Sequence, residues 1–236
     1  MRILLAQQCP IDRPWLPPGK LENALLQTGH TLCCLKVVSE REQGNPASSM
    51  AIPKREILCS ADDLTAELPF GLPGFTAEND ENRRTYDSLT DHELAEYRAV
   101  LRDALDELIN EFDPHIVVVQ YLWVFAHLAL ESGVPYVVQV HGPELATAAK
   151  DPRYRPLVEQ AGENAGRLLV AGDEIRQQLL RDFEFSPALI TQWPTAETAI
   201  VDKSGAAEAA AITRQAEELV GICTAVVRQR FGQIPD

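Results

Sequence analysis

The stretch IVVVQYLWVFAHLALESGVPYVVQVHGPEL, residues 116–145, decides how the chain is expected to fold. It opens with the apolar run Ile116–Val119, continues with a helical segment at Leu122–Ser132 and returns to a mostly apolar run at Val134–Val140. Runs of this kind are typical of strands that are covered on both faces of a parallel sheet. The stretch therefore predicts a strand, a crossover helix and a second strand parallel to the first.

The same alternation of strands and helices extends along the chain in both directions. Near the amino terminus, predicted strands at Arg2–Ala6 and His30–Val38 flank a short helix at Leu21–Thr28, which Gly29 ends. The further predicted elements are a strand at 55–59, helices at 156–165 and 173–183, and strands at 167–170 and 189–191.

A long amphipathic helix is predicted at Asp91–Phe112, with Thr90 as its cap and Glu93 three residues later. Together these elements predict an α/β fold: a single Rossmann-like domain over residues 1–200, with a doubly wound, mostly parallel sheet and helices on both faces. Residues 39–88 are rich in Pro, Ser, Asn and Asp, and the sequence predicts little regular structure there.

The character of the chain changes after Trp193-Pro194. Residues 201–205 are predicted to be a linker, and residues 206–232 form an alanine-rich segment with one apolar face, which predicts a long helix. One interpretation of this helix is that it makes a homodimer.

Composition limits the classes of function. The 236 residues carry a formal net charge of -14, which disfavours nucleic acid as a partner because phosphate backbones are repelled. No apolar run is long enough for an integral membrane segment, and the short apolar start does not resemble a signal peptide, so we expect a cytoplasmic protein. The five cysteines are odd in number and lack CxxC spacing, which predicts reduced thiols and no metal site.

Candidate site residues follow the strands, because open α/β sheets bind ligands beyond the carboxyl ends of their strands. Three places qualify: Gly19-Lys20, Gln120-Tyr121 and His141–Glu144. The chain has no GxSxG, GxxxxGK[ST] or HExxH motif, and the first turn has one glycine where a dinucleotide fingerprint needs three. The sequence therefore predicts no nicotinamide or other cofactor. Two alternatives to a binding role remain. His141 at the strand end only caps a turn, or Lys20 is only a surface residue.

The segment FDPHIVVVQYLWVFAHLALESGVPYVVQVHGPEL resembles the amino-terminal domain of the family 4 glycosyltransferases, which have the two-domain GT-B fold. The opening MRILL, the TGHTL turn and GRLLVAGDEIRQQLLRDF are also similar to segments of that family. The resemblance covers roughly residues 1–38 and 86–200. It implies a retaining transfer of a sugar from a nucleotide-sugar donor to a small-molecule or glycan acceptor, a reaction of hexosyltransferase type, without a cofactor or metal.

The resemblance also implies roles for the candidate residues. His141 would be the catalytic residue that contacts the transferred sugar, and Gly142 would allow close backbone approach. Glu144 would lie at the rim and meet acceptor hydroxyls. Gly19 and Lys20 would lie near the donor phosphates, and Gln120 and Tyr121 would line the acceptor side.

The chain also departs from the family. Prolines replace a glycine of the first loop, which removes N–H donors, and Gly172 replaces the family's serine. No glutamate pair has the spacing with which the second GT-B domain grips a nucleotide, and few residues separate the predicted linker from the last helix. We therefore expect the nucleotide-binding domain to be absent, the last helix to pack back on the first domain, and the chain to be inactive alone. The alternative is a non-catalytic Rossmann-like module that binds a carbohydrate or a protein.

Overall fold

The computed structural model describes residues 1–8, 19–39, 52–60, 62, 65–75, 84–193 and 205–234. The predicted linker therefore lies outside the described residues, apart from Gly205, which begins the last helix. Cys9 and the prolines that precede Gly19 also lie outside them.

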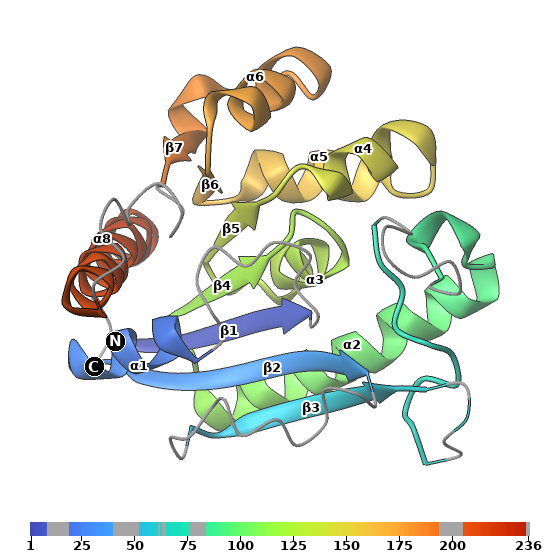
Figure 1. Ribbon diagram of the computed structural model, residues 1–236, viewed down its shortest axis with the longest axis horizontal. Coiled ribbons are helices and arrows are strands. Elements are labelled where there is room, and N and C mark those ends of the chain that lie inside the picture. Colours follow the sequence, from blue (N-terminus) through green and yellow to red (C-terminus); the bar gives the residue numbers. More distant parts are fainter. Residues whose placement is uncertain are drawn as a thin grey trace.

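Seven strands of the described chain form one sheet, in which all neighbouring strands are parallel (Figure 1). Their order is β3-β2-β1-β4-β5-β6-β7, so the chain winds outward in both directions from β1. This arrangement confirms the predicted doubly wound parallel sheet. The strands are β1 Arg2–Gln8, β2 Thr31–Ser39, β3 Lys54–Cys59, β4 Ile116–Gln120, β5 Tyr136–Val140, β6 Arg167–Val170 and β7 Ile190–Gln192.

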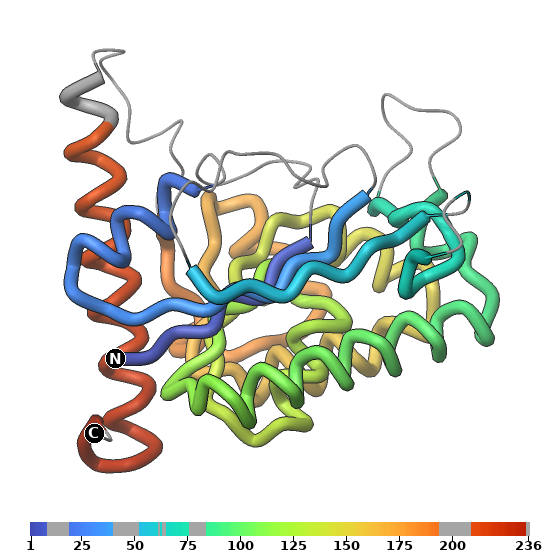
Figure 2. Tube along the Cα trace, turned by 90° about the horizontal axis from the view of Figure 1, so that it is seen from below, coloured from blue at the N-terminus to red at the C-terminus, as the bar shows by residue number. Residues whose placement is uncertain are grey.

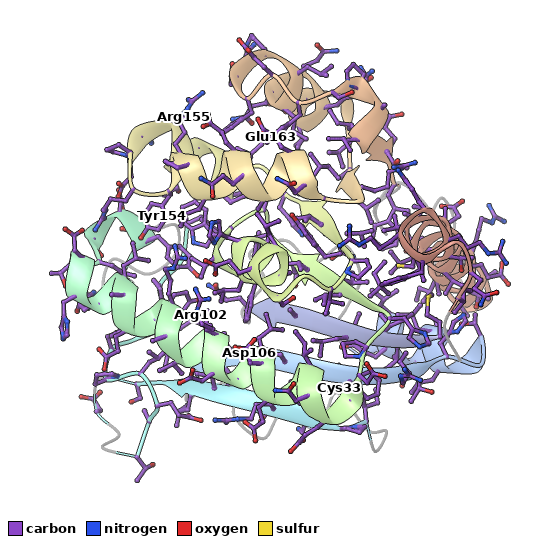
Figure 3. The ribbon with its side chains drawn as sticks, turned by 180° about the vertical axis from the view of Figure 1, so that it is seen from behind. Cys33, Arg102, Asp106, Tyr154, Arg155 and Glu163 are labelled. Atoms are coloured by element: carbon purple, nitrogen blue, oxygen red, sulfur yellow. The ribbon has the colours of Figure 1, made fainter. Side chains whose placement is uncertain are left out.

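Helices cover both faces of the sheet, as predicted. Side chains of α2, α3 and α5 pack on one side, which we call the α2 face, and those of α1 and α8 pack on the other, which we call the α8 face (Figures 1 and 3). The helices of the described chain are α1 Lys20–Gln27, α2 Asp91–Phe112, α3 Val124–Ser132, α4 Pro143–Lys150, α5 Arg155–Asn164, α6 Asp173–Asp182 and α8 Gly205–Phe231, with short 3-10 turns η1 Tyr86–Ser88 and η2 Pro187–Leu189.

The start of α2 is as the sequence predicts. The Thr90 hydroxyl accepts a hydrogen bond from the Glu93 N–H at 3.2 Å, and the Glu93 carboxylate accepts from the Thr90 N–H at 2.8 Å. This reciprocal pair satisfies donors that a helix start leaves open. It fixes the residue at which α2 begins.

Several boundaries differ from the predicted ones for a local reason. The helix predicted from Leu122 begins at Val124, because Tyr121 has a positive φ of 73° and Trp123 is extended. The strand predicted from Val134 begins at Tyr136. Helix α4 starts directly after Gly142, whose φ is 107°.

Helix α8 lies against the α8 face beside α1, along one side of the domain (Figures 1 and 2). Its buried residues include Ala216, Leu219 and Cys223. The contact with the domain is close at Gly166, where a Cβ atom would lie 2.4 Å from Val226 Cγ1. Glycine at this position therefore lets α8 approach the start of β6.

Candidate functional site

The predicted site residues lie around the carboxyl edge, the end of the sheet where β1, β4 and β5 finish. The strand order reverses between β1 and β4, and open α/β sheets bind ligands next to this switch point. Gln8 ends β1, Gln120 ends β4 and His141 follows β5 directly. The fold thus brings together residues from distant parts of the sequence.

His141 is half-buried and held at several points. Its Nε2 lies 3.4 Å from Gln120 Nε2, and its ring lies over that of Tyr121 with the centroids 4.8 Å apart. The His141 backbone N–H donates to Glu144 Oε1 at 2.8 Å. The ring is therefore neither loose on the surface nor enclosed among aliphatic side chains.

Gly142 makes the turn between β5 and α4. Its φ of 107° lies in a region that L side chains rarely adopt, and it is followed by Pro143, which is favourable at the first position of a helix. A Cβ atom on Gly142 would lie 3.6 Å from Ile175 Cγ1 of α6, which is an ordinary contact distance. Backbone conformation rather than space is thus the reason for glycine here.

Glu144 does not lie at the rim, where we expected it, because the whole residue is 0% exposed. Burial raises the pKa of its carboxyl to about 7, because a buried charge is unfavourable. The backbone N–H groups of His141, Glu144, Leu122 and Gly142 act in the opposite direction. Among the described residues, Glu144 Oε2 has no partner in hydrogen-bond geometry.

Gln120 and Tyr121 are also buried, at 4% and 3% exposed. The Gln120 Oε1 atom has no hydrogen-bond partner among the described residues. The Tyr121 ring packs edge-on against Phe75, with the centroids 4.8 Å apart. Positive φ at a non-glycine residue is sparsely populated and is found where neighbouring structure holds it. These two residues are therefore part of the packed support of His141.

Gly19 and Lys20 lie at the start of α1, on the α8 face. Gly19 is buried with a φ of 83°, and Lys20 is half-buried as the first residue of the helix. The glycine thus provides the left-handed conformation from which α1 begins. Whether these residues bind phosphate stays a prediction.

Sequence reasoning missed Gln8, although a polar residue at the end of an apolar strand was the signal that identified Gln120. Its amide nitrogen donates to the Pro73 carbonyl at 2.8 Å. Its oxygen accepts from the hydroxyls of Tyr86 and Tyr97, the latter at 3.2 Å. Burial raises the pKa of both phenols, so they stay protonated donors.

An aromatic cluster surrounds this amide on the α2 face. The Trp123 and Tyr154 rings are stacked with the centroids 4.1 Å apart, and Phe75 and Tyr86 pack on Trp123. The Tyr154 hydroxyl donates to the Tyr86 carbonyl at 2.7 Å. The cluster fastens the segments 68–75 and 84–89 over the strand ends.

Three other predicted features can be examined in the described residues. The four described cysteines are all buried, and no disulfide bond joins any two of them: Cys33, Cys34, Cys59 and Cys223. No group of His, Cys, Asp and Glu there has the arrangement of a metal site. None of the helices in these ranges combines the length and the hydropathy that crossing a bilayer requires.

Residues 69–196, more than half of the chain, match a family model described as the glycosyl transferase 4-like domain. No curated protein sequence matches the chain.

Solved structures are similar in fold. A structure of sucrose-phosphate synthase from Thermosynechococcus elongatus is 13% identical with a TM-score of 0.52, and the match covers 93% of this chain and 99% of that one. Another structure of the same enzyme is 11% identical, with a TM-score of 0.50 and coverage of 81% and 47%. UDP-GlcNAc 2-epimerase from Methanocaldococcus jannaschii is 13% identical, with a TM-score of 0.50 and coverage of 83% and 46%. The chain thus spans about half the length of the last two.

Proposed function

Because the chain belongs to the glycosyl transferase 4-like domain family, we propose that it is the acceptor-binding, amino-terminal domain of a retaining glycosyltransferase. The complete enzyme moves a sugar from a nucleotide-sugar donor to a small-molecule or glycan acceptor. In this proposal residues 1–200 form the domain, 201–205 a linker and 206–232 a helix that packs back on it.

The observation that carries the proposal is the position of His141. Its half-buried imidazole follows β5 at the carboxyl edge, beside the switch point, and is held by Gln120, Tyr121 and Glu144. A fixed polar ring at this place can orient a sugar through hydrogen bonds to its hydroxyls. Catalysis then depends on orientation and electrostatics, which need groups that are held in place before the substrate binds.

The other candidate residues take supporting roles in this proposal. Gly142 has no side chain, so in this proposal a ligand can approach its backbone closely. Gly19 and Lys20 bind donor phosphates, because a helix amino terminus and an ammonium group both favour an anion. Gln120 and Tyr121 lie on the acceptor side, where they hold the His141 ring from behind.

In the proposal, the donor nucleotide binds mainly to a second domain. Two of the solved relatives support this view, because the chain matches about half of each. The packing of α8 at Gly166 and alongside α1 also fits a helix that returns to the first domain. Taken alone, the chain then binds its ligands weakly and turns over nothing.

The test is a calorimetric titration of the chain with UDP-GlcNAc, other nucleotide sugars and simple sugar acceptors. We expect dissociation constants of ~1 mM for wild type and at least tenfold weaker binding for His141→Ala, a loss of ~1.4 kcal/mol or more. His92→Ala is the control, because His92 is exposed in the first turn of α2. Equal binding by wild type and His141→Ala would contradict the role of His141.

Two further outcomes would also decide against the proposal. In the first, the chain binds a carbohydrate or a protein but shows no turnover of sugar nucleotides with any second domain. This result supports a non-catalytic module. In the second, the chain binds none of these ligands, and the remaining interpretation is that it is only a structural scaffold.

A further inference from the structure

The side chain of Gln120 meets one edge of the His141 ring. Gln120 ends β4 and is 4% exposed, and its amide nitrogen lies 3.4 Å from His141 Nε2. The nitrogen of a side-chain amide carries two hydrogens and acts only as a donor. A hydrogen bond between these two atoms therefore requires that His141 Nε2 carries no proton and accepts.

The orientation of the Gln120 amide is consistent with this bond. Its other polar atom, Oε1, is buried and has no hydrogen-bond partner among the described residues. In protein interiors a carbonyl oxygen is left unpaired more often than an N–H group is. The amide thus bonds to the ring through the group that is the more costly to leave unpaired.

The register of the sheet brings Gln120 and His141 together. Gln120 pairs with Gln139 of β5 in the parallel ladder, and the N–H of the next residue, Tyr121, donates to the Gln139 carbonyl at 3.1 Å. His141 follows the last residue of β5 directly. The backbones on both sides of the contact are therefore held by strand pairing between β4 and β5.

The His141 ring is held at two further points. The Tyr121 ring packs on it with the centroids 4.8 Å apart, and the His141 backbone N–H donates to Glu144 Oε1 at 2.8 Å. These two contacts fix the position of the ring and of its backbone. Of the three contacts, only the one with Gln120 involves a ring nitrogen. A neutral imidazole carries one proton, and the hydrogen bond made by one nitrogen decides which of the two carries it.

We infer that Gln120 is a positioning residue: its amide holds His141 as the neutral tautomer that carries its proton on Nδ1. The ring is then an acceptor at Nε2 and a donor at Nδ1. The consequence for sugar transfer rests on the proposed function, in which the tautomer decides whether a ring nitrogen meets a sugar hydroxyl as donor or as acceptor. The tautomer itself is a property of the folded chain.

The first test measures the tautomer in wild type by 15N NMR of the His141 ring. The chemical shift of each ring nitrogen reports whether it carries the proton, and the signals that disappear in His141→Ala belong to this ring. The measurement is made at about pH 8, above the ordinary histidine pKa of about 6.5. We expect the Nδ1–H form in at least ~5-fold excess, the size that one net hydrogen bond supports. A smaller ratio, or an excess of the Nε2–H form, would overturn the inference.

The second test changes the group that faces Nε2. Gln120→Met keeps the length of the side chain and removes the donor, so the excess of the Nδ1–H form should fall at least ~3-fold. Gln120→Glu places an acceptor there instead, so Nε2 should gain a proton, in the Nε2–H tautomer or in the imidazolium. Gln139→Met is the matched control, because Gln139 is 5% exposed and pairs with Gln120 on the neighbouring strand. It should keep the wild-type tautomer.

A purely structural role for Gln120 gives a different pattern. In that case Gln120→Met would lower the free energy of unfolding and leave the tautomer as it is in wild type. A change of tautomer as large in Gln139→Met as in Gln120→Met would likewise point to a general loosening of the sheet. Either result would overturn the inference. If neither Gln120 variant folds, the wild-type measurement decides by itself.

These measurements omit sugar ligands, so they separate this inference from the proposed function. A chain with the expected tautomer that binds neither UDP-GlcNAc nor simple acceptors supports the role of Gln120 and contradicts the proposed function. A chain that binds these probes with the His141 proton on Nε2 supports the proposed function and overturns the role of Gln120.

Discussion

The two faces of the sheet are filled in different ways. On the α2 face, aromatic rings interlock, and the buried Gln8 amide is bonded through both its oxygen and its nitrogen. On the α8 face the core is mainly aliphatic, and Trp193 is its one buried ring among the described residues. The buried Lys36 there pairs with Glu22 of α1, with 3.3 Å between Nζ and Oε1.

This difference shows two ways of enclosing polar groups in the core of the domain. The α2 face bonds the Gln8 amide to neutral partners inside a dense aromatic cluster, whereas the α8 face encloses Lys36 with an ion pair between a strand and a helix. A buried ion pair is sensitive to the loss of one partner, because the other is left charged without compensation. The aromatic cluster is sensitive to lost volume instead.

The largest effect should come from the aromatic cluster. Trp123→Ala removes the ring that stacks on Tyr154 and also contacts Phe75 and Tyr86, so we expect a loss of about 4 kcal/mol in the free energy of unfolding. Urea denaturation followed by far-ultraviolet circular dichroism measures it. Phe231→Ala is the control, because that ring is 50% exposed. Similar losses in both variants would contradict the importance of the cluster.

The next largest loss in the free energy of unfolding is expected when the ion pair of the α8 face is broken. Glu22→Leu removes the carboxylate that lies 3.3 Å from the Lys36 ammonium, whose side chain is 11% exposed, and should cost about 3 kcal/mol. Adding Lys36→Met should recover most of this loss, because the buried ammonium is then removed as well. Thermal unfolding of both variants is the measurement. A double variant as unstable as Glu22→Leu alone would show that packing rather than charge is responsible.

The third prediction concerns pH and the carboxyl edge. Burial raises the pKa of Glu144 from 4.5 to about 7, so the folded state holds a proton more tightly than the unfolded state does. The resulting stabilisation is complete below pH 4.5 and is lost as the pH rises through about 7. From pH 5 to pH 8, wild type should lose about 2 kcal/mol relative to Glu144→Gln. Parallel urea curves for the two proteins at these pH values would refute the shifted pKa.

The smallest effects are expected at two glycines, one on each face, where an added Cβ atom would clash with a neighbouring side chain. A Cβ at Gly162 would lie 2.3 Å from the Phe185 ring, and one at Gly166 would lie 2.4 Å from Val226 of α8. We expect each alanine substitution to cost about 1–2 kcal/mol. Val226→Ala should relieve Gly166→Ala but not Gly162→Ala, which a double-mutant cycle measures. Relief of both, or of neither, would show that α8 does not pack on Gly166 as described.

The family resemblance read from the motifs is confirmed, and so is the fold class, because both rest on local signals. The run Ile116–Val119, the strand that ends at Val140 and the capping box at Thr90 are each recognisable within a few residues. The burial of Glu144 was not recognisable, because it depends on which segments pack over the start of α4. Gln8 was missed for the same reason, since its partners are Pro73, Tyr86 and Tyr97.

The sequence by itself determined the alternation of strands and helices, since hydrophobic periodicity depends only on neighbouring residues. It also placed His141 directly after a strand and so at the carboxyl edge. Only the tertiary structure decided which of the polar residues at that edge are buried and what they contact. Those contacts join segments that meet only after the sheet has formed, so no local pattern records them.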